Sequence, residues 1–198
     1  MNTLAKQPVF IDVVFPETKI IGITKDVVLV LSFGLLTALA AQISFWIGPV
    51  PITGQTFVVL ISGILLGSVR GALSQIFYLS VGLTGFPFWF AAGGSLGIAR
   101  LVGPTGGYLI GFVAAAFLVG RLAEKGWDRN IKTTISAMIL GSMVIYVFGL
   151  VRLANFIPTQ NLFQAGLFPF ILGDLLKIFL VGLFLPKGWR LIKKIKTS

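Results

Sequence analysis

The stretch "PFILGDLLKIFLVGLFL", residues 169–185, is apolar except for two charged side chains, Asp174 and Lys177. Its length approaches the roughly 20 mostly apolar residues that a helix needs to cross the hydrocarbon core of a bilayer. The whole chain of 198 residues has the same character, with 56% hydrophobic residues, 11% charged residues and a mean hydropathy of +0.98. Since a soluble domain carries about a quarter charged residues, this composition predicts an all-α integral membrane protein.

Five further apolar runs precede this stretch and give six candidate spans in all. The second and third are separated only by Arg70 and Gly71, which predicts a tight helical hairpin. The alternative is one long kinked helix, which would leave five spans. The candidate spans cover residues 27–47, 55–69, 72–86, 105–122, 133–151 and 167–185.

The placement of Lys and Arg favours six spans over five. With the N-terminus in the cytoplasm, the segments inside carry thirteen cations, whereas the outside loops carry only Arg100 and Arg152. Short cytoplasmic loops are enriched in Lys and Arg, so this asymmetry predicts that both termini are cytoplasmic. We expect a single membrane domain over residues 1–198, with an N-terminal extension (1–25), a six-helix bundle (about 27–185) and a basic cytoplasmic tail (186–198).

The three predicted outside loops, residues 47–56, 83–108 and 155–166, are poor in charge and rich in Gly, Pro and aromatic residues. One interpretation is that they are plain connectors. The second loop is too long and too apolar for a passive connector, however. Irregular backbone at membrane depth persists where protein or a cavity covers it. We therefore expect these loops to form a lid over a pocket that opens to the outside.

Several function classes are disfavoured by what the sequence lacks. It contains no Cys and no His, which removes disulfides and the usual zinc and haem ligands, so no metal or cofactor is expected. No phosphate-binding loop of the type G-x-x-x-x-G-K-[ST] and no nucleophile with a base are evident, so an enzyme is not expected. The net charge of +10 suits anionic lipid headgroups better than nucleic acid. No cleavable signal peptide is evident in the first 25 residues.

Asp174 and Lys177 are three residues apart, so a helix places both on one face. Ionised groups inside a span are costly unless they are paired or face a polar cavity. Three interpretations remain open: an ion pair that only supports the structure, a polar contact for a ligand in an apolar pocket, and an ion relay. One carboxylate without His makes a poor relay.

Small residues recur at intervals of four and predict close helix packing. Gly63, Gly67 and Gly71 follow this spacing, as do residues 103, 107 and 111, which are also glycines. In the first span, Gly34 and Ala38 form another small face. That face suits either packing within the bundle or docking of a partner membrane protein.

Four stretches resemble the signature motifs of the BioY family, in order and in spacing. They are "PVPITGQT" (49–56), "AGGSLG" (92–97), "GPTGGYLIGF" (103–112) and "PFILGDLLK" (169–177). The resemblance covers residues 27 to 190. BioY proteins are the biotin-specific S components of energy-coupling factor (ECF) transporters.

The resemblance implies a six-helix S component in the cell membrane that captures biotin from outside. A separate module of one transmembrane T protein and two ABC ATPases would supply the energy. A stand-alone secondary transporter or channel, or a membrane interaction protein with a structural Asp–Lys pair, is the alternative.

The resemblance also implies which residues contact the ligand. Asp174 and Lys177 occupy the G-D-x-x-K motif, and Gln55 ends the first motif with Thr56. Ser95 stands where relatives carry Asn, and Leu109 stands where some carry Arg, so Lys177 or Arg100 would anchor the biotin carboxylate. The implied binding residues are Asp174, Lys177, Gln55, Gly94, Ser95, Tyr108 and Arg100, and the family's small-residue patch for the T protein corresponds to Gly34 and Ala38. The aromatic residues 86 and 88–90 would give apolar cover.

Overall fold

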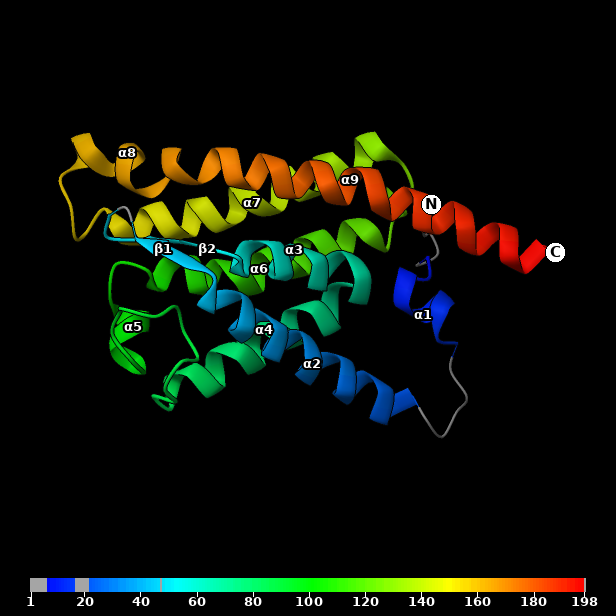
Figure 1. The fold of residues 1–198 in the computed structure, drawn as a ribbon, viewed down its shortest axis with the longest axis horizontal. Helices are drawn as coiled ribbons and strands as arrows, with labels where there is room; N and C mark the ends of the chain where they lie inside the picture. Colours follow the sequence, from blue (N-terminus) through cyan, green and yellow to red (C-terminus); the bar gives the residue numbers. More distant parts are fainter. Residues whose placement is uncertain (1–6, 17–21, 47, 198) are drawn as a thin grey trace, which may run out of the picture.

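The computed structural model describes residues 7–16, 22–46 and 48–197, and these are predominantly helical. Six long helices run lengthwise through the molecule (Figure 1). They are α2 (Gly22–Gln42), α3 (Gln55–Leu66), α4 (Ser68–Leu83), α6 (Gly106–Ala123), α7 (Ile131–Leu153) and α9 (Phe168–Thr197). Each contains most of one predicted span.

Four stretches of the described chain are long and apolar enough to cross a membrane. They are Gly22–Gln42, Gly106–Ala123, Ile131–Leu153 and Thr159–Lys194, the last of which contains most of α9. Helix α3 is apolar but has only 12 residues, and α4 has 16 residues and carries Arg70 in its first turn. The structure is thus that of a helical membrane protein.

Short elements gather at the two ends of this bundle. At one end lie α5 (Ile98–Val102), α8 (Leu162–Gly166), the 3-10 helix η2 (Thr159–Asn161) and a hairpin of β1 (Ser44–Trp46) with β2 (Pro51–Thr53). The antiparallel hairpin pairs Ser44 with Thr53 and Trp46 with Pro51. At the other end lie α1 (Phe10–Val14) and the 3-10 helix η1 (Trp127–Arg129). The Gly- and Pro-rich sequence of this loop predicts only irregular backbone where the hairpin forms.

The break between the second and third predicted spans lies at Gly67, not at Arg70 and Gly71 as predicted. Gly67 has φ +88° and ψ 178°, a conformation that side-chain-bearing residues rarely adopt. The chain reverses there, and a Cβ on Gly71 would lie 2.8 Å from the Cα of Gly63. Helices α3 and α4 are therefore a hairpin in close contact, and the single fused helix is wrong.

The last helix is longer than the predicted span. Helix α9 continues through Pro186 to Thr197, so residues 186–197 are helical. Proline removes one backbone hydrogen bond from a helix interior, but a single loss does not end α9.

The small face of α2 packs inside the bundle. Gly34, Thr37, Ala38 and Ala41 are the buried residues of α2. A Cβ on Gly34 would clash with the ring of Phe77 on α4 and approach the carbonyl oxygen of Ser74 at 3.0 Å. In this conformation Gly34 packs against α4, and Ala38, one turn further along α2, is buried. Docking of a partner at these two residues stays a prediction.

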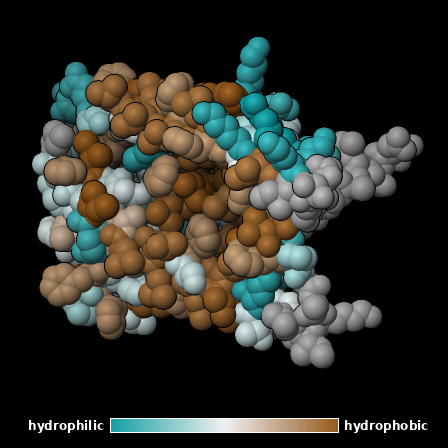
Figure 2. Space-filling view, turned by 45° about the vertical axis from the view of Figure 1, so that its right-hand side comes forward, coloured by the Kyte–Doolittle hydropathy of each residue, from teal (hydrophilic) through white to brown (hydrophobic). Residues whose placement is uncertain are grey.

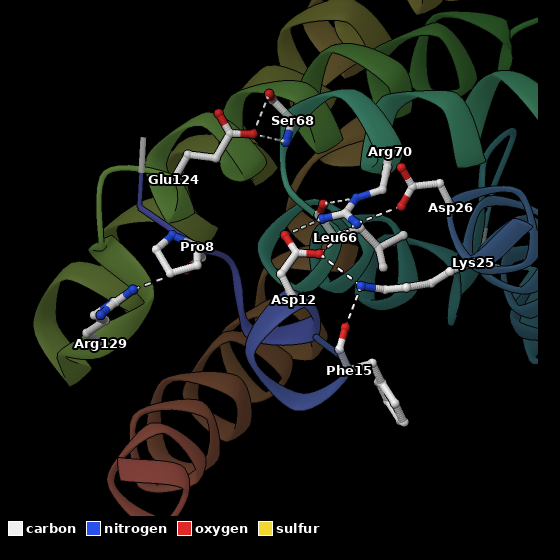
Figure 3. A network of polar contacts seen from close by, with 10 residues as sticks. All are labelled: Pro8, Asp12, Phe15, Lys25, Asp26, Leu66, Ser68, Arg70, Glu124 and Arg129. Atoms are coloured by element: carbon white, nitrogen blue, oxygen red, sulfur yellow. Dashed lines mark hydrogen bonds and ion pairs between the residues drawn. The ribbon is translucent and has the colours of Figure 1, made fainter. Parts of the chain in front are cut away.

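A polar network joins α1 to the helix ends beside it (Figure 3). The guanidinium of Arg70 donates to both carboxylate oxygens of Asp12 at 2.8 and 2.7 Å and to Asp26 at 2.8 Å. Burial alone would raise the pKa of Asp12, but Arg70 and Lys25 outweigh this effect and hold that pKa below its usual value. The described part of the predicted extension is thus fixed to the bundle.

The close approach of α3 to α6 at Gly63 predicts that added side-chain volume at this position lowers stability. A Cβ on Gly63 would clash with the carbonyl oxygen of Ala116 on α6, whereas a Cβ on Gly173 would meet nothing within 4 Å. We expect Gly63→Ala to lower stability by about 1–3 kcal/mol, the usual cost of overpacking. Gly173→Ala should be neutral or stabilising, because Ala favours the helix. Thermal unfolding of both variants in one detergent tests this, and equal melting temperatures would contradict it.

Candidate ligand-binding site

A cavity lies at the end of the bundle that carries the β-hairpin. It contains about 540 Å³ of space between atoms, including its open mouth. Its walls are mainly apolar, with Val50, Phe90, Leu109, Phe112, Ile145 and Phe170. Its polar lining residues are Thr53, Gln55, Thr56, Arg100, Thr105, Tyr108, Tyr146 and Lys177.

Asp174 and Lys177 form one ion pair, with Lys177 Nζ 2.9 Å from Asp174 Oδ1. The ammonium also donates to Thr56 Oγ1 at 2.8 Å and to the carbonyl oxygen of Thr53 at 3.1 Å. An ammonium has three donors, so this set engages all of them. Lys177 lines the cavity, whereas the carboxylate of Asp174 lies behind it and is buried.

The carboxylate of Asp174 also joins α3 and α7 to α9. Thr56 Oγ1 lies 3.0 Å from Asp174 Oδ1, and the hydroxyl of Tyr146 donates to Asp174 Oδ2. Both carboxylate oxygens are therefore satisfied within the protein. This arrangement agrees with an ion pair that supports the structure, and a ligand contact by Asp174 requires one of its present hydrogen bonds to be exchanged.

Arg100 is a buried cation in the cavity wall, with 5% of its surface exposed. Its guanidinium donates to the carbonyl oxygen of Ala91 at 3.3 Å and lies 5.4 Å from the ring centre of Trp46. No carboxylate in the described part of the chain lies within ion-pairing distance of Arg100. A buried charge without a counter-ion is costly, so this guanidinium is suited to an anionic group in the cavity.

Gly94 and Ser95 lie outside the main cavity, beside Arg100. A Cβ on Gly94 would overlap the guanidinium of Arg100, so glycine makes room for that side chain. Ser95 is exposed and lines a separate hollow with Gly93, Gly94 and Arg100. Gly94 therefore contributes to the site indirectly, because it leaves space for the side chain of Arg100. Ser95 lies at the rim of the site.

Gln55 and Tyr108 both line the cavity, as the resemblance implied. The amide nitrogen of Gln55 donates to the hydroxyl of Tyr78 at 2.6 Å, and its amide oxygen accepts from Thr53 at 2.9 Å. The hydroxyl of Tyr108 donates to the carbonyl oxygen of Gly166 at 2.8 Å. These bonds fix both side chains in the wall.

The expected aromatic cover is only partly present. Phe90 lines the cavity, and Trp89 is buried and donates to the carbonyl oxygen of Tyr78 at 2.7 Å. Phe86 and Phe88 are 57% and 80% exposed and do not line the cavity. Phe88 has φ +58°, which turns the chain at this point.

Sequence reasoning missed Thr53, Thr56 and Tyr146. Thr53 and Thr56 lie within "PVPITGQT", beside Gln55, and their position in that motif was a usable signal. Tyr146 is the only tyrosine of the apolar helix α7. Its hydroxyl needs a hydrogen-bond partner when it is buried inside a span, which was a second usable signal. Among the described residues no group of three or more Asp and Glu side chains could hold a metal ion.

Comparison with known proteins gives consistent matches. The model of the BioY family matches residues 6–194. A protein of Pyrococcus horikoshii named as a probable biotin transporter BioY is 42% identical over 153 residues, which cover 77% of this chain and 89% of that protein. The biotin transporter BioY of Thermotoga maritima is 36% identical over 154 residues, which cover 76% and 89%.

A solved structure shares the fold. The crystal structure of the S component for biotin from an ECF-type ABC transporter matches with a TM-score of 0.71. The match covers 92% of this chain and 95% of that one at 24% identity.

The hydroxyl of Thr56 bridges the ion pair and predicts a stability effect. Thr56→Val keeps the shape of the side chain but removes the oxygen that contacts Lys177 and Asp174. We expect a loss of about 1.5–3 kcal/mol, the usual contribution of a hydrogen bond to a charged group. Thr84→Val is the matched control, because the exposed Thr84 hydroxyl contacts only the carbonyl oxygen of Val81. Equal melting temperatures for the two variants would contradict this role.

Proposed function

This chain belongs to the BioY family, and we propose that it is a biotin-binding S component of an ECF-type ABC transporter. The observation that carries the proposal is the buried guanidinium of Arg100, which faces an apolar cavity without a counter-ion among the described residues. Biotin offers a carboxylate for this cation, an apolar bicyclic ring for the walls and a polar ureido group. An apolar pocket with few placed polar groups is the usual form of a small-molecule site.

The ureido group is assigned to the opposite side of the cavity from Arg100. Lys177 is placed to donate to the ureido carbonyl in exchange for its bond to Thr53. Asp174 accepts from a ureido N–H in exchange for its bond to Thr56. Gln55 and Tyr108 complete the wall, and Gly94 and Ser95 act at the rim beside Arg100.

The proposed topology is six spans in the cell membrane, within one domain, with both termini in the cytoplasm and the cavity open to the outside. The positive-inside asymmetry supports this orientation. Short α3 and α4 are included as spans because they pack as a hairpin within the bundle.

The proposed partners are a T protein and two ABC ATPases, since this chain carries no phosphate-binding loop of its own. Gly34 and Ala38 of α2 are the proposed docking residues for the T protein. Both are buried in this conformation, so a partner would first meet the exposed residues of α2, which include Leu31, Leu35 and Leu39. Biotin uptake in cells that lack any such module separates this proposal from a stand-alone transporter or channel.

Titration calorimetry of the detergent-purified protein tests the function directly. We expect biotin to bind, and biotin methyl ester to bind at least tenfold more weakly, because the ester gives Arg100 no charge. Arg100→Gln should weaken biotin binding at least tenfold, about 1.4 kcal/mol, and remove most of the preference for the acid. Arg152→Gln is the control, since Arg152 lies over Phe156 outside the cavity. Absence of heat with biotin would contradict the function.

A charge swap separates ligand contact from structural pairing at Asp174 and Lys177. We expect Asp174→Asn to weaken biotin binding at least tenfold, about 1.4 kcal/mol. The double variant Asp174→Lys with Lys177→Asp should bind worse than either single variant, because it places a cation against the ureido donors. If the swap restores binding, the pair is structural only. Monodisperse elution of each variant is the control for folding.

Labelling of single cysteines tests the orientation, because the chain has no natural Cys. In intact cells, a membrane-impermeant maleimide should label Ser95→Cys and should spare Lys194→Cys. Both variants should react after the membrane is made permeable. Labelling of Lys194→Cys from outside would overturn the topology.

A further inference from the structure

A second hollow lies on the lipid-facing side of the bundle, away from the ligand cavity. Toward the end that carries α1, helices α3 and α9 leave an apolar groove with about 650 Å³ of space between atoms. Figure 2 shows a hollow in this hydrophobic face, with hydrophilic residues gathered beside it. Six residues form its rims: Phe57, Ile61 and Leu65 of α3, and Leu180, Phe184 and Leu185 of α9.

The groove spans most of the thickness of one bilayer leaflet. It runs from Leu180 to Gly188 on α9, about 12 Å at the helical rise of 1.5 Å per residue. The hydrocarbon core of a bilayer is about 30 Å thick, so one leaflet is about 15 Å. Phe10 of α1 lines the groove and packs edge-on against Trp189, and it closes the end nearest the aqueous interface.

A cation stands at that closed end. Lys187 Nζ lies 5.8 Å from the ring centre of Phe184, which itself lines the groove. The side chain of Lys187 is exposed and forms no ion pair with any other residue in the described ranges.

We propose that this groove binds one acyl chain of an anionic phospholipid from the leaflet on the α1 side, with its phosphate held by Lys187. A basic residue next to an apolar groove matches the two parts of such a lipid. The site is separate from the ligand cavity and is independent of the identity of the transported compound.

A lipid fits this groove better than a helix from a partner protein. A helix with its side chains is about 10–12 Å wide, so a partner helix approaches closely only where small residues line the groove. Its rims carry Phe, Ile and Leu instead of the small residues that let helices approach closely in lipid. A flexible chain can follow such a groove without a flat contact surface.

Native mass spectrometry of the full chain tests the site. The purified protein is mixed with equal amounts of phosphatidylglycerol and phosphatidylcholine that carry the same acyl chains, and the retained lipid is counted. One cation near an anionic lipid contributes about fivefold in binding, so we expect a preference of at least about fivefold for phosphatidylglycerol. Lys187→Gln should reduce this preference about fivefold, whereas Lys132→Gln, at the start of α7, should not.

A second pair of variants tests the groove itself. Ile61→Trp fills the groove and should remove most retained phosphatidylglycerol. Leu172→Trp, at a position 81% exposed on the far part of α9, should leave it unchanged.

Equal retention of both lipids by the wild-type chain would overturn the proposal. Retention that survives Ile61→Trp would overturn it too, since the lipid then adheres only to the surface. Loss of a co-purifying membrane protein by Ile61→Trp, with lipid unchanged, would assign the groove to a helix instead.

Discussion

A charge inside hydrocarbon must be satisfied by the protein itself, and the arrangement of this molecule around Asp174 follows from that constraint. The carboxylate lies in α9, yet its partners come from α3, α7 and α9 itself, through Thr56, Tyr146 and Lys177. These three helices therefore have to converge at one end of the bundle. The same convergence places Lys177 in the wall of the cavity, so the interactions that support the structure also shape the site.

Small residues let the helix backbones approach closely, and large side chains keep them further apart. Gly63 meets the backbone of α6, and Gly71 meets α3, so α3, α4 and α6 form a dense centre. Helix α9 lacks such a contact with α3 over its second half, where large side chains face each other across the groove. The bundle is consequently tightly packed on one side and leaves an open groove on the other.

The two ends of the bundle differ in how their charges are balanced. Beside α1, Arg70 is neutralised by Asp12 and Asp26, and Glu124 accepts from the backbone and the hydroxyl of Ser68 at 2.8 and 2.7 Å. At the other end, Arg100 is buried without such a carboxylate among the described residues. A buried cation that is paired with carboxylates does not draw an anion into the protein, whereas a buried cation without them does. Of these two buried guanidinium groups, only that of Arg100 is therefore suited to an anionic ligand.

The sequence by itself determined the membrane class, the six helices and the pair of Asp174 with Lys177, because hydropathy and helical spacing are local properties of the chain. The BioY-like motifs also pointed to Gln55 and Tyr108, and the resemblance offered Arg100 as an anchor for the carboxylate; the structure places all three in the lining of one cavity. Only the tertiary structure decided that Gly34 faces α4, that the chain reverses at Gly67, and that Thr53, Thr56 and Tyr146 join the site. These features depend on contacts between residues far apart in the chain, and local spacing carries no information about which helix lies opposite.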